Sequence, residues 1–192
     1  MNVLAMTLLF LVAAWVPAAP QERAPANWKL FVSETQHFSV VYPGSWNRLL
    51  GADGRPINDG LEIINFPNRE RVTGVVIKKG GANISVVGLA PDSTPFGWHT
   101  VDDWIRFSVR HRIVIDQSEI SVAGAAPTQC TTLKRVVSEI PTSGDAYQID
   151  TSYYCTAGGW LYSVSEGNWK GDPHQNDLQE IALQVVLSLR SR

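Results

Sequence analysis

The sequence predicts an α+β domain built on a mainly antiparallel sheet, and three observations support this class. Short segments rich in valine, isoleucine, threonine and aromatic residues follow one another with only turn-forming residues between them, which is typical of strands joined by hairpins. Only two segments repeat apolar residues with helical spacing. The chain has 192 residues, of which 44% are hydrophobic and 18% are charged. One globular domain with a sizeable core is therefore expected.

The N-terminal segment predicts export. Residues 3–16 are almost wholly apolar and are followed by small residues up to Ala18, as in a secretory signal peptide with its cleavage site. About 20 apolar residues are needed to cross a bilayer as a helix, and this stretch is shorter. We expect a signal peptide over 1–18, a disordered lead over 19–27, and one domain over 28–190 without a transmembrane segment. An uncleaved anchor is the alternative.

The predicted strands end at residues that favour turns or that cannot continue a ladder. Pro43 closes the strand over 38–42, because proline has no N–H to donate. The run Gly-Gly-Ala-Asn at 80–83 predicts a hairpin turn, since glycine accepts a positive φ at no steric cost. The complete set of predicted strands is 28–32, 38–42, 61–66, 75–78, 84–89, 119–122, 128–139, 146–156 and 160–165.

The first predicted helix begins at Thr100. Asp103 follows three residues later, so that the pair resembles a capping box with Asp in place of the usual Glu. The apolar face of this helix consists of Val101, Trp104, Ile105 and Ser108. Arg110, His111 and Arg112 at its end suit the negative pole of the helix dipole.

The second predicted helix is the C-terminal segment. Asp172 is expected to cap it, with Pro173 at the first helical position. Its apolar stripe consists of Leu178, Ile181, Ala182, Val185, Val186 and Leu189, and this stripe must lie against the sheet. Arg190 and Arg192 near its end suit the negative pole of the dipole.

The two cysteines predict a disulfide. An exported chain with two cysteines allows one intramolecular pairing, Cys130 with Cys155. If the hairpin is centred on the turn cluster at 141–144, these two residues face each other directly. The same register pairs Val136 with Ile149, Arg135 with Asp150, and Thr132 with Tyr153. A redox-active pair and two free thiols are the alternatives.

Two regions of the sequence resemble the PsbP-like proteins. The stretch from Phe38 to Trp46 resembles their opening pattern, F-x-hydrophobic-x-Y-P-x-x-W, and the tyrosine-containing strand at 160–164 with the last helix ending at 186–190 resembles their ending. The resemblance covers roughly Trp28 to Arg190. It implies an α/β/α sandwich with a central antiparallel sheet. The family includes extrinsic subunits of photosystem II, a nuclear-transport Ran-binding protein, and bacterial envelope proteins such as DcrB and LpqN; most bind partners and do not catalyse.

Catalytic and metal-binding patterns are few. Nucleophile-elbow, zinc-protease, Walker and dinucleotide motifs are absent from the sequence. His99 with Asp102 and Asp103, and His174 with Asp172 and Asp177, could hold a metal or orient a base, but capping and the helix dipole explain those carboxylates. No catalytic residue, metal ligand or cofactor is therefore assigned, and His37 is expected in a loop. The net charge of −2 and the pI near 6.1 also argue against nucleic acid as a partner.

The aromatic residues are the stronger functional signal. Trp46 and Trp104 fit core positions. Four further residues form a possible partner or ligand surface: Trp98, His99, Trp160 and Trp169. Packing of these rings under the helices is the alternative. Asn83 begins a glycosylation sequon that we expect in a turn.

Three functional hypotheses follow. The first is an exported, non-enzymatic accessory or binding protein, secreted or periplasmic, that acts through a protein partner in the cell envelope. The second is a small-molecule or glycan binder with an aromatic-lined pocket between sheet and helix, with Trp98 or Trp160 in its wall. The third is a metal- or histidine-dependent hydrolase built on His99 or His174. The sequence does not define an oligomeric state.

Overall fold

The computed structural model describes residues 26–51, 53–56, 59–66, 81–93, 97–141 and 147–192. In chain order its elements are β1 (Trp28–Ser33), β2 (Phe38–Pro43), β3 (Asn47–Arg48), β4 (Leu61–Ile64), β5 (Asn83–Leu89), the 3-10 helix η2 (Pro91–Ser93), α1 (Val101–Val109), β6 (Ile113–Ser121), β7 (Thr132–Pro141), β8 (Tyr147–Ala157), β9 (Trp160–Trp169), α2 (Gln175–Ser188) and β10 (Arg190–Ser191). The predicted signal peptide and the predicted strand over 75–78 lie outside the described residues, as does most of the lead.

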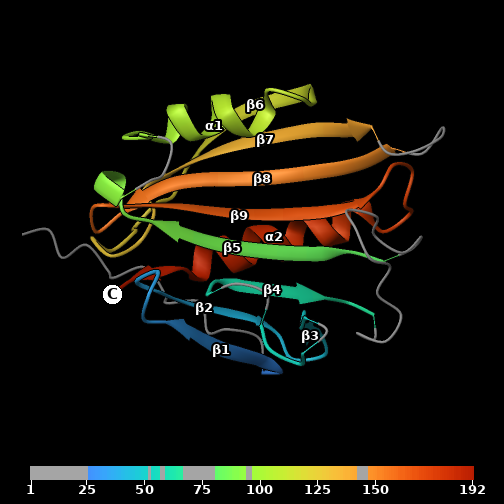
Figure 1. The fold of residues 1–192 in the computed structure, drawn as a ribbon, viewed down its shortest axis with the longest axis horizontal. Coiled ribbons are helices and arrows are strands. Elements are labelled where there is room, and N and C mark those ends of the chain that lie inside the picture. Colours follow the sequence, from blue (N-terminus) through green and yellow to red (C-terminus); the bar gives the residue numbers. More distant parts are fainter. Residues whose placement is uncertain (1–25, 52, 57–58, 67–80, 94–96, 142–146) are drawn as a thin grey trace, which may run out of the picture.

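The described strands form two antiparallel sheets (Figure 1). The larger has seven strands in the order β3-β4-β5-β9-β8-β7-β6, and the smaller has the order β1-β2-β10. All the pairings between the described strands are antiparallel. The predicted α+β class and the mainly antiparallel sheet are confirmed.

The two helices cover opposite faces of the larger sheet. Trp104 of α1 packs with Tyr154 of β8, whereas α2 packs with a core that contains Tyr153, the adjacent residue of the same strand. Because successive residues of a strand point to opposite faces, α1 and α2 must lie on opposite sides. This arrangement is the α/β/α sandwich that the resemblance implies. We call the two sides the α1 face and the α2 face.

The capping box of α1 is confirmed. Thr100 Oγ1 accepts a hydrogen bond from the Asp103 N–H at 3.1 Å, and Asp103 Oδ2 accepts one from the Thr100 N–H, also at 3.1 Å. The helix buries Trp104 and Ile105, both on the predicted apolar face.

The predicted start of α2 is wrong by two residues. The N-cap is His174, whose side chain makes no capping hydrogen bond, and Asp172 instead accepts a bond from the His174 N–H at 2.8 Å. The reason is a turn before the helix, in which the Gln175 N–H donates to the Asp172 carbonyl. The buried stripe is confirmed at Leu178, Ala182, Val185 and Val186.

The helix α2 ends at Ser188, after which the chain becomes extended and β10 pairs with β2. The Arg190 guanidinium turns back and donates to the carbonyls of Leu187 and Leu189 at 3.0 and 2.9 Å. The predicted contact of Arg190 with the carbonyl end of the helix is thus present. Arg192 lies away from it and pairs with Glu34 at 2.6 Å.

The predicted register of the β7–β8 hairpin is wrong by three residues. Pro141 pairs with Tyr147, so a five-residue connection replaces the two-residue turn on which the prediction was centred. Val136 therefore faces Ser152, not Ile149, and Arg135 faces Tyr153, not Asp150. Tyr153 is consequently not the partner of Thr132. Because a shift by an odd number exchanges the two faces of a strand, each predicted pair is also split between the faces.

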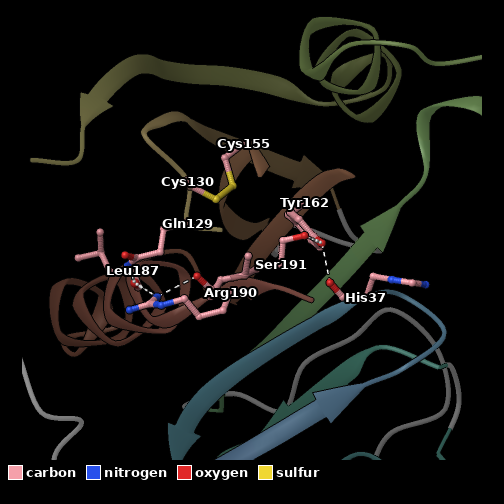
Figure 2. Close-up of a disulfide and its surroundings, with 9 residues drawn as sticks. His37, Gln129, Cys130, Cys155, Tyr162, Leu187, Arg190 and Ser191 are labelled. Carbon is pink, nitrogen blue, oxygen red and sulfur yellow. Dashed lines mark hydrogen bonds between the residues drawn. A yellow bond between two sulfur atoms is a disulfide. The ribbon is translucent and has the colours of Figure 1, made fainter. Parts of the chain in front are cut away.

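The Cys130–Cys155 disulfide is nevertheless present, with the two Cα atoms 5.7 Å apart. Cys130 lies before β7 rather than inside it, and both cysteines are buried in the α2-face core (Figure 2). The predicted disulfide is therefore confirmed, whereas the predicted direct pairing of the two cysteines within the hairpin is wrong.

The C-terminus is fastened beside this disulfide (Figure 2). The Tyr162 hydroxyl donates to the His37 carbonyl at 2.7 Å and lies 3.1 Å from Ser191 Oγ. The Arg192 N–H also donates to the His37 carbonyl, at 3.0 Å. Gly88 allows Tyr162 and the turn before β2 to lie close against its own backbone. A Cβ at this position would lie 2.4 Å from the Gln36 carbonyl oxygen. We call this set of contacts the C-terminal clasp.

Candidate functional site

A cleft of about 400 Å³ opens at the C-terminal end of α1. It lies on the α1 face and combines residues of α1, of the segments that precede and follow it, and of β7. Its lining consists of Trp98, Trp104, Phe107, Ser108, Arg110, His111, Arg112 and Ile140. We call it the α1 cleft.

Aromatic rings form one wall of the α1 cleft. Trp104 is buried and meets the ring of Tyr154 edge-on, with the centroids 5.6 Å apart. Trp98 is half-buried and lies against both Trp104 and Phe107, at centroid distances of 5.9 and 4.6 Å. The spacing of three residues places Trp104 and Phe107 on the same side of α1. The sheet thus holds the Trp104 ring in place. Trp104 in turn supports the rings of Trp98 and Phe107, which are only partly buried.

Cationic side chains form the rim. The Arg110 guanidinium lies 3.7 Å from the centre of the Phe107 ring, a cation–π contact, and it has no carboxylate partner among the described residues. Arg112 donates to the carboxylate of Asp150, which is buried. His111 is exposed, and the lining residues that the structure describes include no Asp or Glu. The α1 cleft therefore offers aromatic surface beside one unneutralised guanidinium, which suits a ligand with an apolar part and a negative charge.

The structure brings only some of the predicted surface residues to this cleft. Trp98 lies in its wall, and His99 is exposed beside it. Trp160 stacks on His37 instead, with the centroids 4.5 Å apart and the rings 22° from parallel, and it packs partly against the α2-face core. Trp169 lies at the other end of β9, opposite Gln148. Because 160 and 169 differ by an odd number, they point to opposite faces of the sheet. The four residues do not form one surface.

Capping accounts for the carboxylates near His99. The Thr100 hydroxyl, with the backbone N–H of His99, lowers the pKa of Asp103 to about 2. The contact between His99 and Asp103 therefore uses the backbone, not the imidazole. Asp102 points elsewhere and binds Lys134 Nζ at 2.7 Å.

The second predicted histidine site is a surface pair. His174 Nδ1 lies 3.5 Å from Asp177 Oδ2, and both side chains are more than 70% exposed. Among the described residues, no three His, Cys, Asp or Glu side chains converge as metal ligands would. Asn83 lies at the start of β5, paired with Ile64 and Gly167, so its sequon is on a strand and not in the expected turn.

Sequence reasoning missed a buried carboxyl on the α2 face. Glu166 is 0% exposed, and neither side-chain oxygen has a hydrogen-bond partner. Burial, and then the negative charges of Asp150 and Asp172, raise its pKa to about 9. Glu166 is therefore neutral at pH 7. The sequence signal for this buried carboxyl is the alternation of the strand. Glu166 shares its strand face with Tyr162 and Val164, which are fully buried.

The cleft residues that were missed come from elements that only the fold brings together. Ile140 reaches the cleft from the end of β7, and Phe107 and Arg110 lie one turn apart on α1 and its C-cap. The dipole explanation of Arg110, His111 and Arg112 hid their second role as the rim of the cleft.

Comparison with solved structures confirms the fold. The solution structure of cyanobacterial PsbP (CyanoP) from Synechocystis sp. PCC 6803 is similar with a TM-score of 0.52 at 13% identity, over 91% of this chain and 98% of that one. The Ran-binding protein Mog1p of Saccharomyces cerevisiae gives 0.51 at 10% identity, over 86% and 95%. The chain therefore has the PsbP-like fold.

The remaining comparisons do not identify a function for the chain. A crystal structure from Bacteroides thetaiotaomicron VPI-5482 is similar at 15% identity and a TM-score of 0.47, over 86% of this chain, which spans 49% of that protein. No protein-family model matches the sequence, and no curated protein is significantly similar to it. Within the described part of the chain, no helix combines the length and the apolar character that a membrane span requires.

Proposed function

We propose that the chain is an exported, non-enzymatic binding protein that holds a protein partner of the cell envelope at the α1 cleft. The observation that carries this proposal is the rim of that cleft, where the Arg110 guanidinium, which has no carboxylate partner in the part of the chain that the structure describes, lies over the Phe107 ring. Aromatic residues and arginine are the side chains that most often dominate the energy of protein interfaces.

Export is supported by two independent features. The apolar segment over 3–16 has the length and the flanking small residues of a signal peptide. The Cys130–Cys155 disulfide is the kind of bond that persists in oxidising compartments outside the cytosol. Mog1p, one of the similar structures, is by its name a Ran-binding protein, but a shared fold does not transfer a partner.

The proposal is tested by photo-crosslinking in the native envelope. A photo-reactive amino acid is placed at His111, on the rim of the cleft, or at Leu30, which is 67% exposed on β1, as the matched control. We expect one protein, in near-stoichiometric amount, to crosslink from position 111 and not from position 30. Equal capture from both positions, or no specific capture from 111, would refute the proposal.

A second candidate is a small-molecule or glycan binder, and the size of the cleft favours it. About 400 Å³ falls within the roughly 300–1,000 Å³ typical of ligand pockets. Thermal-shift screening of glycans and small anions separates the two functions. A ligand that stabilises the protein, and that no longer does so in the Trp98→Ala variant, would favour this second function.

A further inference from the structure

In the described part of the chain, no segment covers the outer edge of β6. This nine-residue strand is the last in the seven-stranded sheet, and among the described strands it pairs only with β7. An unpaired strand edge presents N–H and C=O groups that can accept an additional strand. Natural proteins often protect such edges with charged side chains, proline or bulges. The strand β6 contains no lysine or proline, and its two carboxylates, Asp116 and Glu119, lie beyond its first three residues.

The same edge exposes apolar side chains. Ile113, Val114 and Ile115 are 53%, 42% and 53% exposed. A bulge between Val114 and Asp116 leaves Ile115 without an opposing residue on β7, so its side chain adds to the exposed surface. Three consecutive exposed apolar residues on an open edge are typical of a strand that binds another chain.

The open edge is continuous with the α1 cleft. Arg110, His111 and Arg112 line the cleft, and the next residue, Ile113, begins β6. The Arg110 guanidinium, which no described carboxylate neutralises, therefore lies just before the N-terminal end of the strand. Farther along, the carboxylates of Asp116 and Glu119 are 52% and 65% exposed and pair with Arg135 and Lys134 of β7.

This charge distribution selects the direction of an added strand. A strand antiparallel to β6 ends beside the N-terminal residues of β6, so its carboxyl terminus would meet the Arg110 guanidinium. A parallel strand would instead bring its terminal ammonium group to the Arg110 guanidinium, which is unfavourable. The antiparallel direction also matches every pairing described in the larger sheet.

We propose that the α1 cleft and the open edge of β6 form one docking surface for the carboxyl-terminal segment of a protein partner. The segment adds to β6 as an antiparallel strand. Its last side chain lies among Trp98 and Phe107, and its terminal carboxylate lies beside Arg110. This inference rests on the proposed function, because it states how the partner occupies the same cleft.

Fluorescence anisotropy of labelled peptides tests this inference on the oxidised, exported protein. The probes are heptapeptides Lys-Thr-Val-Thr-Val-Thr-X with X as Phe, Leu or Ala, each with a free carboxyl terminus or a terminal amide. We expect the free acid with X as Phe to bind most tightly. Amidation should weaken its binding about tenfold or more, because it removes a charge-assisted hydrogen bond. Equal affinity of acid and amide, or no binding by any peptide, would overturn the inference.

Matched variants locate the two parts of the surface. Arg110→Ala should abolish the preference for the free acid. Arg106 is the matched control, because its side chain is 76% exposed and paired with Asp103. Arg106→Ala should retain the preference. Ile113→Lys should weaken every peptide, and Leu30→Lys on β1 should weaken none. A preference that survives Arg110→Ala would also overturn the inference. If crosslinking from position 111 captures a partner while acid and amide bind equally, the proposed function stands and this inference alone fails.

Discussion

The two faces of the larger sheet differ in how they are closed. On the α2 face, the cluster of fully buried residues extends from β2 to Leu189 and includes the disulfide and Tyr162 of the C-terminal clasp. On the α1 face, the corresponding cluster contains five buried residues: Trp104, Ile105, Val136, Tyr154 and Leu161. Trp98 packs against this smaller cluster but stays partly exposed at the cleft. The α2 face therefore supplies most of the buried contacts that stabilise the fold. The α1 face is left free to present side chains.

The comparison also separates two kinds of unsatisfied polar group. Glu166 on the α2 face is enclosed and lacks hydrogen bonds, so it destabilises the fold whenever it is charged. Arg110 on the α1 face lacks a carboxylate partner among the described residues but is exposed to solvent, so its unpaired charge costs the fold little. The first group is a property of the scaffold, and the second is available for binding.

The largest expected effect is on the α2 face. The double variant Cys130→Ala/Cys155→Ala removes a link between residues 25 positions apart, and chain entropy predicts a loss of about 3 kcal/mol in the free energy of unfolding. Urea denaturation measures this loss. A loss below about 1 kcal/mol would show that the disulfide does not hold the α2 face together.

Glu166→Gln should change how stability depends on pH. The folded-state pKa is about 9 and the ordinary value is 4.5, so between these pH values the folded protein keeps a proton that the unfolded chain releases. The stability of the native protein should therefore fall as pH rises, by at most about 1.4 kcal/mol per pH unit. Denaturation from pH 5 to 9 should show a flatter profile for Glu166→Gln, and the native slope for the exposed control Glu180→Gln. If stability falls with pH at the same slope in all three proteins, the raised pKa of Glu166 is contradicted.

Thr100→Ala should have a smaller effect, confined to the α1 face. The substitution removes one bond of the capping box and should cost about 1 kcal/mol. Hydrogen exchange should then increase in α1 and not in α2. Equal acceleration in both helices would mean that the two faces do not open independently.

The smallest expected effect on stability is that of Arg110→Ala. Its side chain is exposed and its guanidinium lies over the Phe107 ring, so the free energy of unfolding should change by less than about 0.5 kcal/mol. Partner capture from position 111 should nevertheless fall. A variant that loses stability and capture together would assign Arg110 to the scaffold.

Local sequence rules predicted the elements whose determinants lie close together in the chain. Thr100 and Asp103 are three residues apart, and the capping box formed as expected. The β7–β8 register failed because the length of the connection, not the composition of its first residues, sets which residues face each other. The pairing of Cys130 with Cys155 survived this error because two cysteines permit only one intramolecular bond.

The candidate site was predictable only in part. Trp98 stood out as an aromatic residue in a turn-rich segment, but Ile140 joins it only through the packing of α1 on β7. Arg110 had a sufficient local explanation in the helix dipole, which concealed its place on the cleft. Trp160 and Trp169 could be separated only once the strand β9 was known to include both.

Hydrogen exchange of the protein alone and in complex with the partner captured from position 111 tests the proposed docking surface most directly. We expect slower exchange in residues 107–116, where the cleft meets the edge of β6, and unchanged exchange in α2 and the C-terminal clasp. Protection centred on α2, or on β1 and β2, would contradict it.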